Sequence, residues 1–238
     1  MSYPGFDVSV YPNDQVMIDL HDSTNFKWCA YYLAPAPNHA ETSWLGRRTN
    51  LAAIGWNFAL LYVGEQQPDQ ATPFLSTNLS AAKGTADGMD AVNLAIREGF
   101  PNNSVIYLDV ESGGPIQPEM LDYTAAWQTQ IINSGYLPGI YCSYLVADAF
   151  QKNAVVLNLL FWIFRMIDQG SQNGSYNSPF PTPDAVGCSI AYATIWQYAQ
   201  NKRISWAGNA LPSVDMDVSS VLDPSRPSDV SGILGRIG

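Results

Sequence analysis

Short apolar runs, each of five or six residues, recur along the chain and are separated by helical or loop-like segments. Eight of these runs predict β-strands, because they are rich in β-branched and aromatic residues and are bounded by turn-forming residues. Most are nearly continuous in apolar residues, which is typical of strands that are covered on both faces. The runs cover residues 5–10, 28–33, 58–63, 105–110, 139–143, 159–164, 193–198 and 214–218.

Helical patterns lie between several of these strands. Met89, Val92 and Ile96 recur at intervals of three and four residues, which predicts a helix with these side chains on its apolar face. Pro118 begins a second helix, whose apolar face repeats as far as Ile131. Two weaker helical patterns and one long loop rich in Gly, Ser, Asn and Pro cover residues 42–54, 145–153 and 168–187, respectively.

Strands that alternate with helices predict a parallel sheet, and eight of them on 238 residues fit an α/β fold, the (β/α)8 TIM-like barrel. We expect all eight strands to be parallel and the helices of the second half to be incomplete. A doubly wound open sheet is the alternative, although no Gly-rich phosphate-binding motif follows the first strand. Residues 1–238 are expected to form one barrel domain, with residues 224–238 as a surface tail.

The net negative charge of the chain disfavours some classes of binding partner. The chain has 11 Lys and Arg against 21 Asp and Glu, a net charge of −10, and only 13% of its residues are charged. It lacks the positive field that attracts nucleic acids and anionic membranes, and its longest apolar stretch, residues 154–167, is shorter than the roughly 20 residues of a membrane span. We therefore expect a monomer that neither binds nucleic acid nor inserts into a membrane.

Acidic residues gather on three of the predicted strands, although charge is scarce elsewhere. Residues two apart on a strand point to the same face, and the C-terminal ends of barrel strands face the active site. The acids that share such faces are Asp7 on the first strand, Asp109 and Glu111 on the fourth, and Asp215 and Asp217 on the eighth. The first and eighth strands are neighbours in a closed barrel, so these acids are expected to converge.

Paired carboxyl groups suit glycoside hydrolysis. Two acids two residues apart on a strand lie roughly 6 to 7 Å apart along the backbone, so the charge of one raises the pKa of the other. Hydrolysis of a glycosidic bond needs a protonated acid for the leaving oxygen and an ionised partner for the oxocarbenium-like centre. We predict Glu111 as the general acid and Asp109 as the ionised partner, with Asp7 and Asp215 completing the catalytic site.

Polar and aromatic residues at other strand ends are candidates for substrate binding. They combine ring surfaces with hydrogen-bonding groups, as sugar recognition requires, although core packing competes as the explanation for the aromatic ones. Arg165 closes an apolar strand and is expected to pair with one of the acids or with an anionic group of the substrate. The predicted substrate-binding residues are Tyr62, Tyr141, Arg165, Trp196, Gln197, Tyr198 and Asp217.

Five motifs in this order resemble a known family. They are Gly5-Phe6-Asp7-Val8-Ser9, Leu108-Asp109-Val110-Glu111, Gly139-Ile140-Tyr141, Trp196-Gln197-Tyr198 and Val214-Asp215. Together they look like the lysozyme-type muramidases of glycoside hydrolase family 25, and more closely like their glycoside-hydrolase-like TIM-barrel relatives, the domain of unknown function 1906.

This resemblance implies that Glu111 is the proton donor and that Asp7, Asp109 and Asp215 hold the sugar or its N-acetyl group. Asp109 would either stabilise the developing charge or orient the 2-acetamido group as an internal nucleophile. The chain departs from the pattern at Asp217, where the muramidases usually have Asn.

The sequence thus predicts a glycosidase that cleaves a cell-wall polysaccharide with no cofactor and no metal. A barrel that binds glycan without cleaving it and a wall-targeting effector domain are the alternatives. An acidic cluster also suits Ca²⁺ or Mg²⁺, but no Asp-rich loop has regular ligand spacing. The role implies an extracellular or cell-envelope location, while no signal peptide is evident at the N-terminus and the export route is open.

Overall fold

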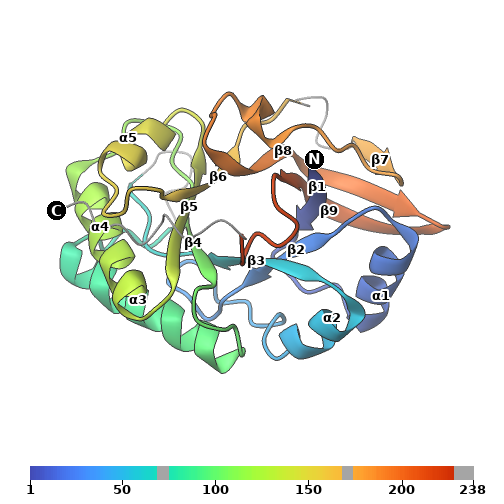
Figure 1. The fold of residues 1–238 in the computed structure, drawn as a ribbon, viewed down its shortest axis with the longest axis horizontal. Helices are drawn as coiled ribbons and strands as arrows, with labels where there is room; N and C mark the ends of the chain where they lie inside the picture. The colour runs from blue at the N-terminus through green and yellow to red at the C-terminus, as the bar shows by residue number, and fades with distance from the viewer. Residues whose placement is uncertain (69–74, 168–173, 228–238) are drawn as a thin grey trace.

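One continuous sheet organises the computed structural model, which describes residues 1–68, 75–167 and 174–227 (Figure 1). Its strand order is β6-β5-β4-β3-β2-β1-β9-β8-β7, and an additional pairing between β6 and β8 closes it into a barrel. The strands are β1 (Tyr3–Asp7), β2 (Trp28–Tyr32), β3 (Asn57–Tyr62), β4 (Val105–Val110), β5 (Leu137–Ser143), β6 (Leu160–Phe164), β7 (Ser175–Asn177), β8 (Ala193–Trp206) and β9 (Asn209–Ser219).

Eight of these strands form the closed barrel, as predicted, and the short β7 adds to the outer edge of β8. The pairings from β1 through β6 and on to β8 are parallel. The prediction that all eight strands are parallel is wrong for the last one, because β9 runs antiparallel to both β8 and β1. A tight turn at Ala207 and Gly208, both with positive φ, joins β8 to β9 and leaves no room for a crossover helix.

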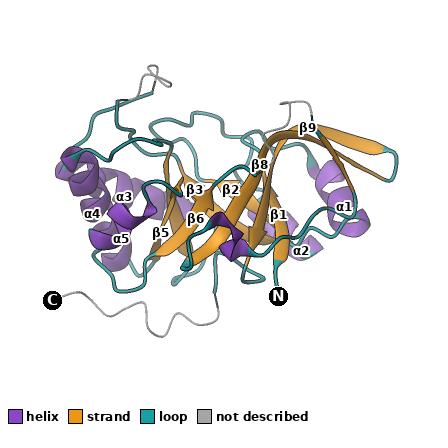
Figure 2. Ribbon diagram, turned by 90° about the horizontal axis from the view of Figure 1, so that it is seen from above, coloured by secondary structure: helices purple, strands orange, loops and turns teal. Residues whose placement is uncertain are grey.

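Helices cover the first half of the barrel and are incomplete in the second (Figure 2). After β6, the only helical element of the described residues is the 3-10 turn η1 (Ala185–Cys188). The sequence pattern missed α1, whose first turn is capped by Asn13 accepting a hydrogen bond from the Val16 amide. The helices are α1 (Asp14–Ser23), α2 (Arg48–Ile54), α3 (Ala81–Arg97), α4 (Pro118–Asn133) and α5 (Ala147–Lys152).

The two long helices, α3 and α4, pack closely on each other. The predicted apolar face of α4 is confirmed, since Met120, Tyr123, Trp127 and Ile131 are all buried. The predicted face of α3 is wrong in part, because Met89 and Ile96 are exposed. Its buried face consists mostly of small residues, and a Cβ added to Gly84 would lie 2.2 Å from the carbonyl oxygen of Tyr123. The buried face of α3 is therefore the one whose small residues allow close approach to α4, not the one that the apolar periodicity indicates.

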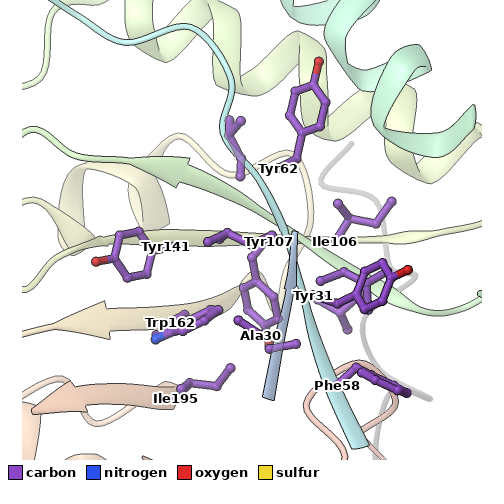
Figure 3. Packing of buried hydrophobic residues seen from close by; sticks show 14 of the residues in the cluster. Ala30, Tyr31, Phe58, Tyr62, Ile106, Tyr107, Tyr141, Trp162 and Ile195 are labelled. Carbon is purple, nitrogen blue, oxygen red and sulfur yellow. The ribbon is translucent and has the colours of Figure 1, made fainter. Parts of the chain in front are cut away.

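Aromatic side chains fill the barrel interior below the C-terminal strand ends (Figure 3). The ring of Trp162 lies edge-on to the rings of Trp28, Tyr107 and Tyr141, with centroids 5.3 to 5.9 Å apart. Such edge-to-face contacts stabilise a core beyond the area they bury. Gly139 makes room for this layer, because a Cβ there would lie 2.4 Å from the Tyr107 ring.

The chain that follows β9 closes the opposite, N-terminal end of the barrel. The Ser225 amide donates to the Phe58 carbonyl, and the Val105 amide donates to the Ser225 carbonyl. Pro224 and Ser225 are buried, so the predicted surface tail is wrong for these residues, which seal the space between β3 and β4. Residues 228–238 of that tail lie outside the described residues.

The three cysteines of the chain, Cys29, Cys142 and Cys188, are all buried free thiols. Across residues 1–68, 75–167 and 174–227, no helix is long and apolar enough to cross a membrane.

We predict that Gly139→Ala lowers the free energy of unfolding by about 1–3 kcal/mol or more, because the new methyl group would overlap the buried Tyr107 ring. Urea unfolding measures this change. Gly113→Ala is the matched control, since no atom lies within 4 Å of a Cβ at that position. Equal stability of the two variants would contradict the tight packing of the aromatic layer.

Candidate active site

Five carboxyl groups meet inside the barrel at the C-terminal ends of the parallel strands. We call Asp7, Asp109, Glu111, Asp215 and Asp217 the acid cluster. The antiparallel ladder between β1 and β9 sets Asp7 directly opposite Asp215 and Gly5 opposite Asp217. Period-two alternation on β4 turns Asp109 and Glu111 to the same interior face, above the aromatic layer. The sequence prediction that these acids converge is therefore confirmed.

The members of the acid cluster differ in depth. Asp217 is fully buried, Asp109 and Asp7 are 5% and 7% exposed, Asp215 is half-buried and Glu111 is exposed. Glu111 follows the last residue of β4, so its longer side chain lies nearest to solvent. The cluster therefore has one exposed residue, Glu111, above four acids that are partly or wholly buried.

Side chains from neighbouring strands hold the buried acids in place. The Tyr32 hydroxyl on β2 donates to Asp7 Oδ1 (2.8 Å), and the Trp162 indole on β6 donates to Asp217 Oδ1 (2.8 Å). Two consecutive hydrogen bonds link β5 and β8 to Asp215 on β9. The Tyr141 hydroxyl donates to Gln197 Oε1 (2.5 Å), and Gln197 Nε2 donates to Asp215 Oδ2 (2.7 Å).

Burial is the first cause of a raised pKa for the acids on β1 and β9. It raises the pKa of Asp7 to about 6, against the opposing effect of the Tyr32 hydrogen bond. Burial and then the charge of Asp7 raise the pKa of Asp215 to about 8. At neutral pH, Asp7 is therefore the more readily ionised of this directly opposed pair.

The two acids of β4 also hold their protons more tightly than usual. Burial raises the pKa of Asp109 well above its ordinary value, and the charges of Glu111 and Asp7 add to this effect. This direction runs against the prediction that Asp109 stays ionised, because its carboxyl group is deeply buried. Glu111 is exposed as a residue, yet desolvation of its carboxyl group, followed by the charge of Asp215, raises its pKa in the direction predicted for a general acid.

Two glutamines after β3 belong to the site, although the sequence analysis did not select them. Gln66 is buried, its Nε2 donates to the Asp109 carbonyl (2.8 Å), and its Oε1 accepts from the Glu111 amide (2.9 Å). Gln67 contacts the loop after Glu111, because its Nε2 donates a hydrogen bond to Ser112 Oγ (2.8 Å). Their signal in the sequence was a polar Gly-Glu-Gln-Gln run directly after an apolar strand.

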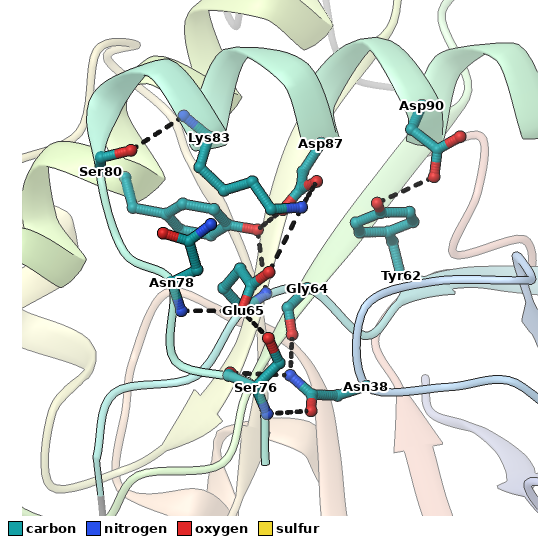
Figure 4. Close-up of polar contacts among 11 residues, drawn as sticks. Asn38, Tyr62, Gly64, Glu65, Ser76, Asn78, Ser80, Lys83, Asp87 and Asp90 are labelled. Atoms are coloured by element: carbon teal, nitrogen blue, oxygen red, sulfur yellow. Dashed lines mark hydrogen bonds and ion pairs between the residues drawn. The ribbon is translucent and has the colours of Figure 1, made fainter.

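The segment that carries these glutamines is anchored by a buried polar network (Figure 4). Glu65 is 3% exposed and forms an ion pair with Lys83 of α3 (3.3 Å), which also pairs with Asp87 (2.5 Å). The Ser76 hydroxyl donates to Glu65 (2.5 Å), and the Glu65 amide donates to the Tyr123 hydroxyl on α4 (3.1 Å). Helices α3 and α4 thus fix the strand end that orients the Glu111 backbone.

Four predicted substrate-binding residues lie away from the acid cluster, in the outer layer of the barrel. Gln197 points inward, so its neighbours Trp196 and Tyr198 point outward. The Trp196 indole donates to the Arg165 carbonyl, and the Tyr198 hydroxyl donates to the Pro181 carbonyl. Tyr62 likewise points outward.

The Tyr62 hydroxyl donates to Asp90 on α3 (3.0 Å), so this side chain contributes to the core between β3 and the helices (Figures 3 and 4). The guanidinium of Arg165 lies 4.9 Å from the centre of the Tyr144 ring and donates to the Ser189 hydroxyl. Within the described residues it forms no ion pair with an acid, so the predicted pairing with the acids is not found, while the pairing with an anionic group of the substrate stays a prediction. Alternation along β6 and β8 directs these side chains outward.

One histidine lies beside the cluster. The His39 ring packs 4.6 Å from the ring of Tyr32, the donor to Asp7, and burial lowers the pKa of His39. It makes no hydrogen bond to an acid of the cluster. Among the described residues, no group of three or more His, Cys, Asp or Glu is arranged to hold a metal ion.

The closed barrel with carboxyl groups at its C-terminal strand ends defines a glycoside hydrolase-like class of protein. The family model described as "Rv2525c-like, glycoside hydrolase-like domain" matches residues 23–219. The chain therefore belongs to this family, which confirms the resemblance found in the sequence. No curated protein matches the chain in sequence.

Solved structures share this fold at low sequence identity. An uncharacterized protein of B. stearothermophilus is 19% identical with a TM-score of 0.61, over 92% of this chain and 96% of that one. The Tat-secreted protein Rv2525c of Mycobacterium tuberculosis, solved with L-tartrate, is 16% identical with a TM-score of 0.57, over 95% and 97%. GHIP, a glycosyl hydrolase 25 of Streptococcus pneumoniae, is 16% identical with a TM-score of 0.60, over 98% and 93%. At such identities these likenesses show the TIM-like fold alone.

We predict that the free energy of unfolding falls as the pH rises from about 5 to about 8. Unfolded aspartates titrate near pH 4, whereas the folded pKa values of Asp7 and Asp215 are about 6 and about 8. Between these limits the folded state holds more protons, so each extra proton costs about 1.4 kcal/mol of stability per pH unit. Urea unfolding at several pH values measures the slope.

Asp215→Asn should make this slope shallower, because it removes one of the titrating groups. Asp122→Asn, on the exposed face of α4, is the matched control and should leave the slope unchanged. Stability that is constant or increases over the same pH range would show that the acid cluster does not hold excess protons.

Proposed function

We propose that this protein is a glycosidase that cleaves a cell-wall polysaccharide, with Glu111 as the general acid. The observation that carries this proposal is the acid cluster itself, in which one accessible glutamate with a raised pKa lies among buried carboxyl groups. Glycoside hydrolysis requires two carboxyl groups in different protonation states on either side of the scissile bond. Family membership supports the same class of reaction.

In the proposed reaction, Glu111 protonates the leaving oxygen of the glycosidic bond. Asp7 is the member most easily ionised at neutral pH, so its carboxylate stabilises the positive charge that develops on the sugar. Asp109 lies deeper on the same strand and orients the substrate, while Tyr141 and Gln197 bind its polar groups. Gln66 keeps the Glu111 backbone in register with Asp109.

The substrate class follows from the residues around the cluster and from the relatives. An uncharged sugar with hydroxyl and amide groups suits a site with several carboxyl groups and neutral donors. Peptidoglycan and chitin fragments have these groups. One structural relative is secreted, and an extracellular or cell-envelope location fits the proposed substrate.

A barrel that binds glycan without cleaving it is the second candidate. The observation that favours it is the number of acids that hold their protons: Asp109 and Asp217 both have pKa values well above the ordinary value. A largely neutral cluster can bind hydroxyl groups without supplying the ionised partner that turnover requires. Binding with no product from any of several wall polymers would favour this function over the first.

We predict that Glu111→Gln lowers the rate of peptidoglycan or chitin-oligosaccharide cleavage by about 10²–10⁴-fold, because the amide cannot donate the catalytic proton. Reducing-end release and mass spectrometry of the products measure the rate. Glu119→Gln, an exposed glutamate in the first turn of α4, is the matched control and should retain full activity. Equal activity of the wild type, Glu111→Gln and Asp109→Asn would contradict the proposal.

A further inference from the structure

The deepest member of the acid cluster has an unusual environment. Asp217 is fully buried, and its Oδ1 accepts a hydrogen bond from the Trp162 indole (2.8 Å). Its second oxygen, Oδ2, is buried and has no donor in the described structure. A carboxylate at this position would carry its charge away from water with a single neutral donor, which is strongly unfavourable.

The groups that face Asp217 offer no compensation for a negative charge. Burial is the first cause of the raised pKa of Asp217, and the charges of Asp7 on β1 and Asp215 on β9 itself raise it further. Trp162 on β6 is a neutral donor, and Gln197, directly opposite Asp217 on β8, donates to Asp215 instead. No Lys, Arg or His among the described residues forms an ion pair with any member of the acid cluster.

A proton on Asp217 satisfies every group in this arrangement. The protonated carboxyl group keeps its carbonyl oxygen as the acceptor for Trp162, while its hydroxyl becomes a donor. Asp7 is the acceptor that the register offers, because the β1–β9 ladder sets Gly5 opposite Asp217 and Asp7 opposite Asp215, and a hydrogen bond from Asp217 is among the causes that lower the pKa of Asp7. Asp7 then has two hydroxyl donors, because the Tyr32 hydroxyl already bonds to its Oδ1 (2.8 Å).

We propose that Asp217 is a permanently protonated positioning residue that donates its hydroxyl proton to Asp7 and thereby makes Asp7 the anionic member of the acid cluster. This explains why Asp7 ionises more readily than Asp215, with pKa values of about 6 and about 8, although Asp7 is the more buried of the two. The use of the Asp7 charge in catalysis rests on the proposed function, whereas the location of the proton does not.

Carboxyl ¹³C NMR titration of the whole chain between about pH 4 and pH 9 tests this proposal. The Asp217 signal should stay at its protonated position over that range, while the Asp7 signal titrates. In Asp217→Asn the amide still accepts from Trp162 and donates to Asp7, so the Asp7 midpoint should move by less than about half a pH unit. Removal of an ionised neighbour would instead lower that midpoint by about one unit or more.

Loss of the proposed Asp217 donor should raise the titration midpoint of Asp7. Asp217→Leu keeps a neutral side chain but cannot donate, so the Asp7 midpoint should rise by about one pH unit. Tyr32→Phe removes the other donor and should raise the Asp7 midpoint in the same direction, which gives the size of the shift for one lost donor. If Asp217→Leu does not fold, the wild-type titration and Asp217→Asn decide. Asp122→Asn is the surface control and should leave the Asp7 midpoint unchanged.

Two results would overturn the proposal: an Asp217 signal that titrates below about pH 7, or a fall of the Asp7 midpoint by about one unit in Asp217→Asn. Neither measurement uses enzymatic activity. A protein that cleaves no glycan would contradict the proposed function and leave the proton on Asp217 to be decided by the titration alone.

Discussion

The antiparallel contact between β1 and β9 is the constraint on which the rest of this structure depends. It joins the first and last strands of the barrel, and its register sets Asp7 opposite Asp215 and Gly5 opposite Asp217. Like charges in direct opposition across a ladder destabilise a sheet. The protein therefore has to keep protons on part of the cluster, and the site's chemistry follows from which carboxyl group loses its proton first.

The surrounding architecture supports this arrangement from three sides. Below the acids, the edge-to-face rings of Trp28, Tyr107 and Trp162 exclude water from the interior. Around them, hydroxyl, indole and amide donors satisfy individual carboxyl oxygens. Behind β4, Gln66 and the ion pair of Glu65 with Lys83 tie the strand end to the helices. Several of the fold's buried polar groups thus hold these carboxyl groups at fixed depths.

In the second half of the barrel, where helices are missing, other segments cover the outer surface. After β6, η1 and the described residues that precede it cover the wall, and outward side chains of β8 pack there instead of against helices. Trp196, Tyr198 and Arg165 are part of this cover. Their position at strand ends made them candidates for sugar binding, because a strand end alone does not tell which face a residue occupies.

The sequence by itself determined the barrel and the acids at its strand ends, because apolar runs, turn residues and period-two alternation are local properties of the chain. It could not determine that β9 runs antiparallel, that Gln66 reaches across to β4, or that burial raises the pKa of Asp109. Those features depend on contacts between residues far apart in sequence. Only the tertiary structure sets how deeply each carboxyl group is buried and which donor it meets, and these two quantities decide where the protons lie.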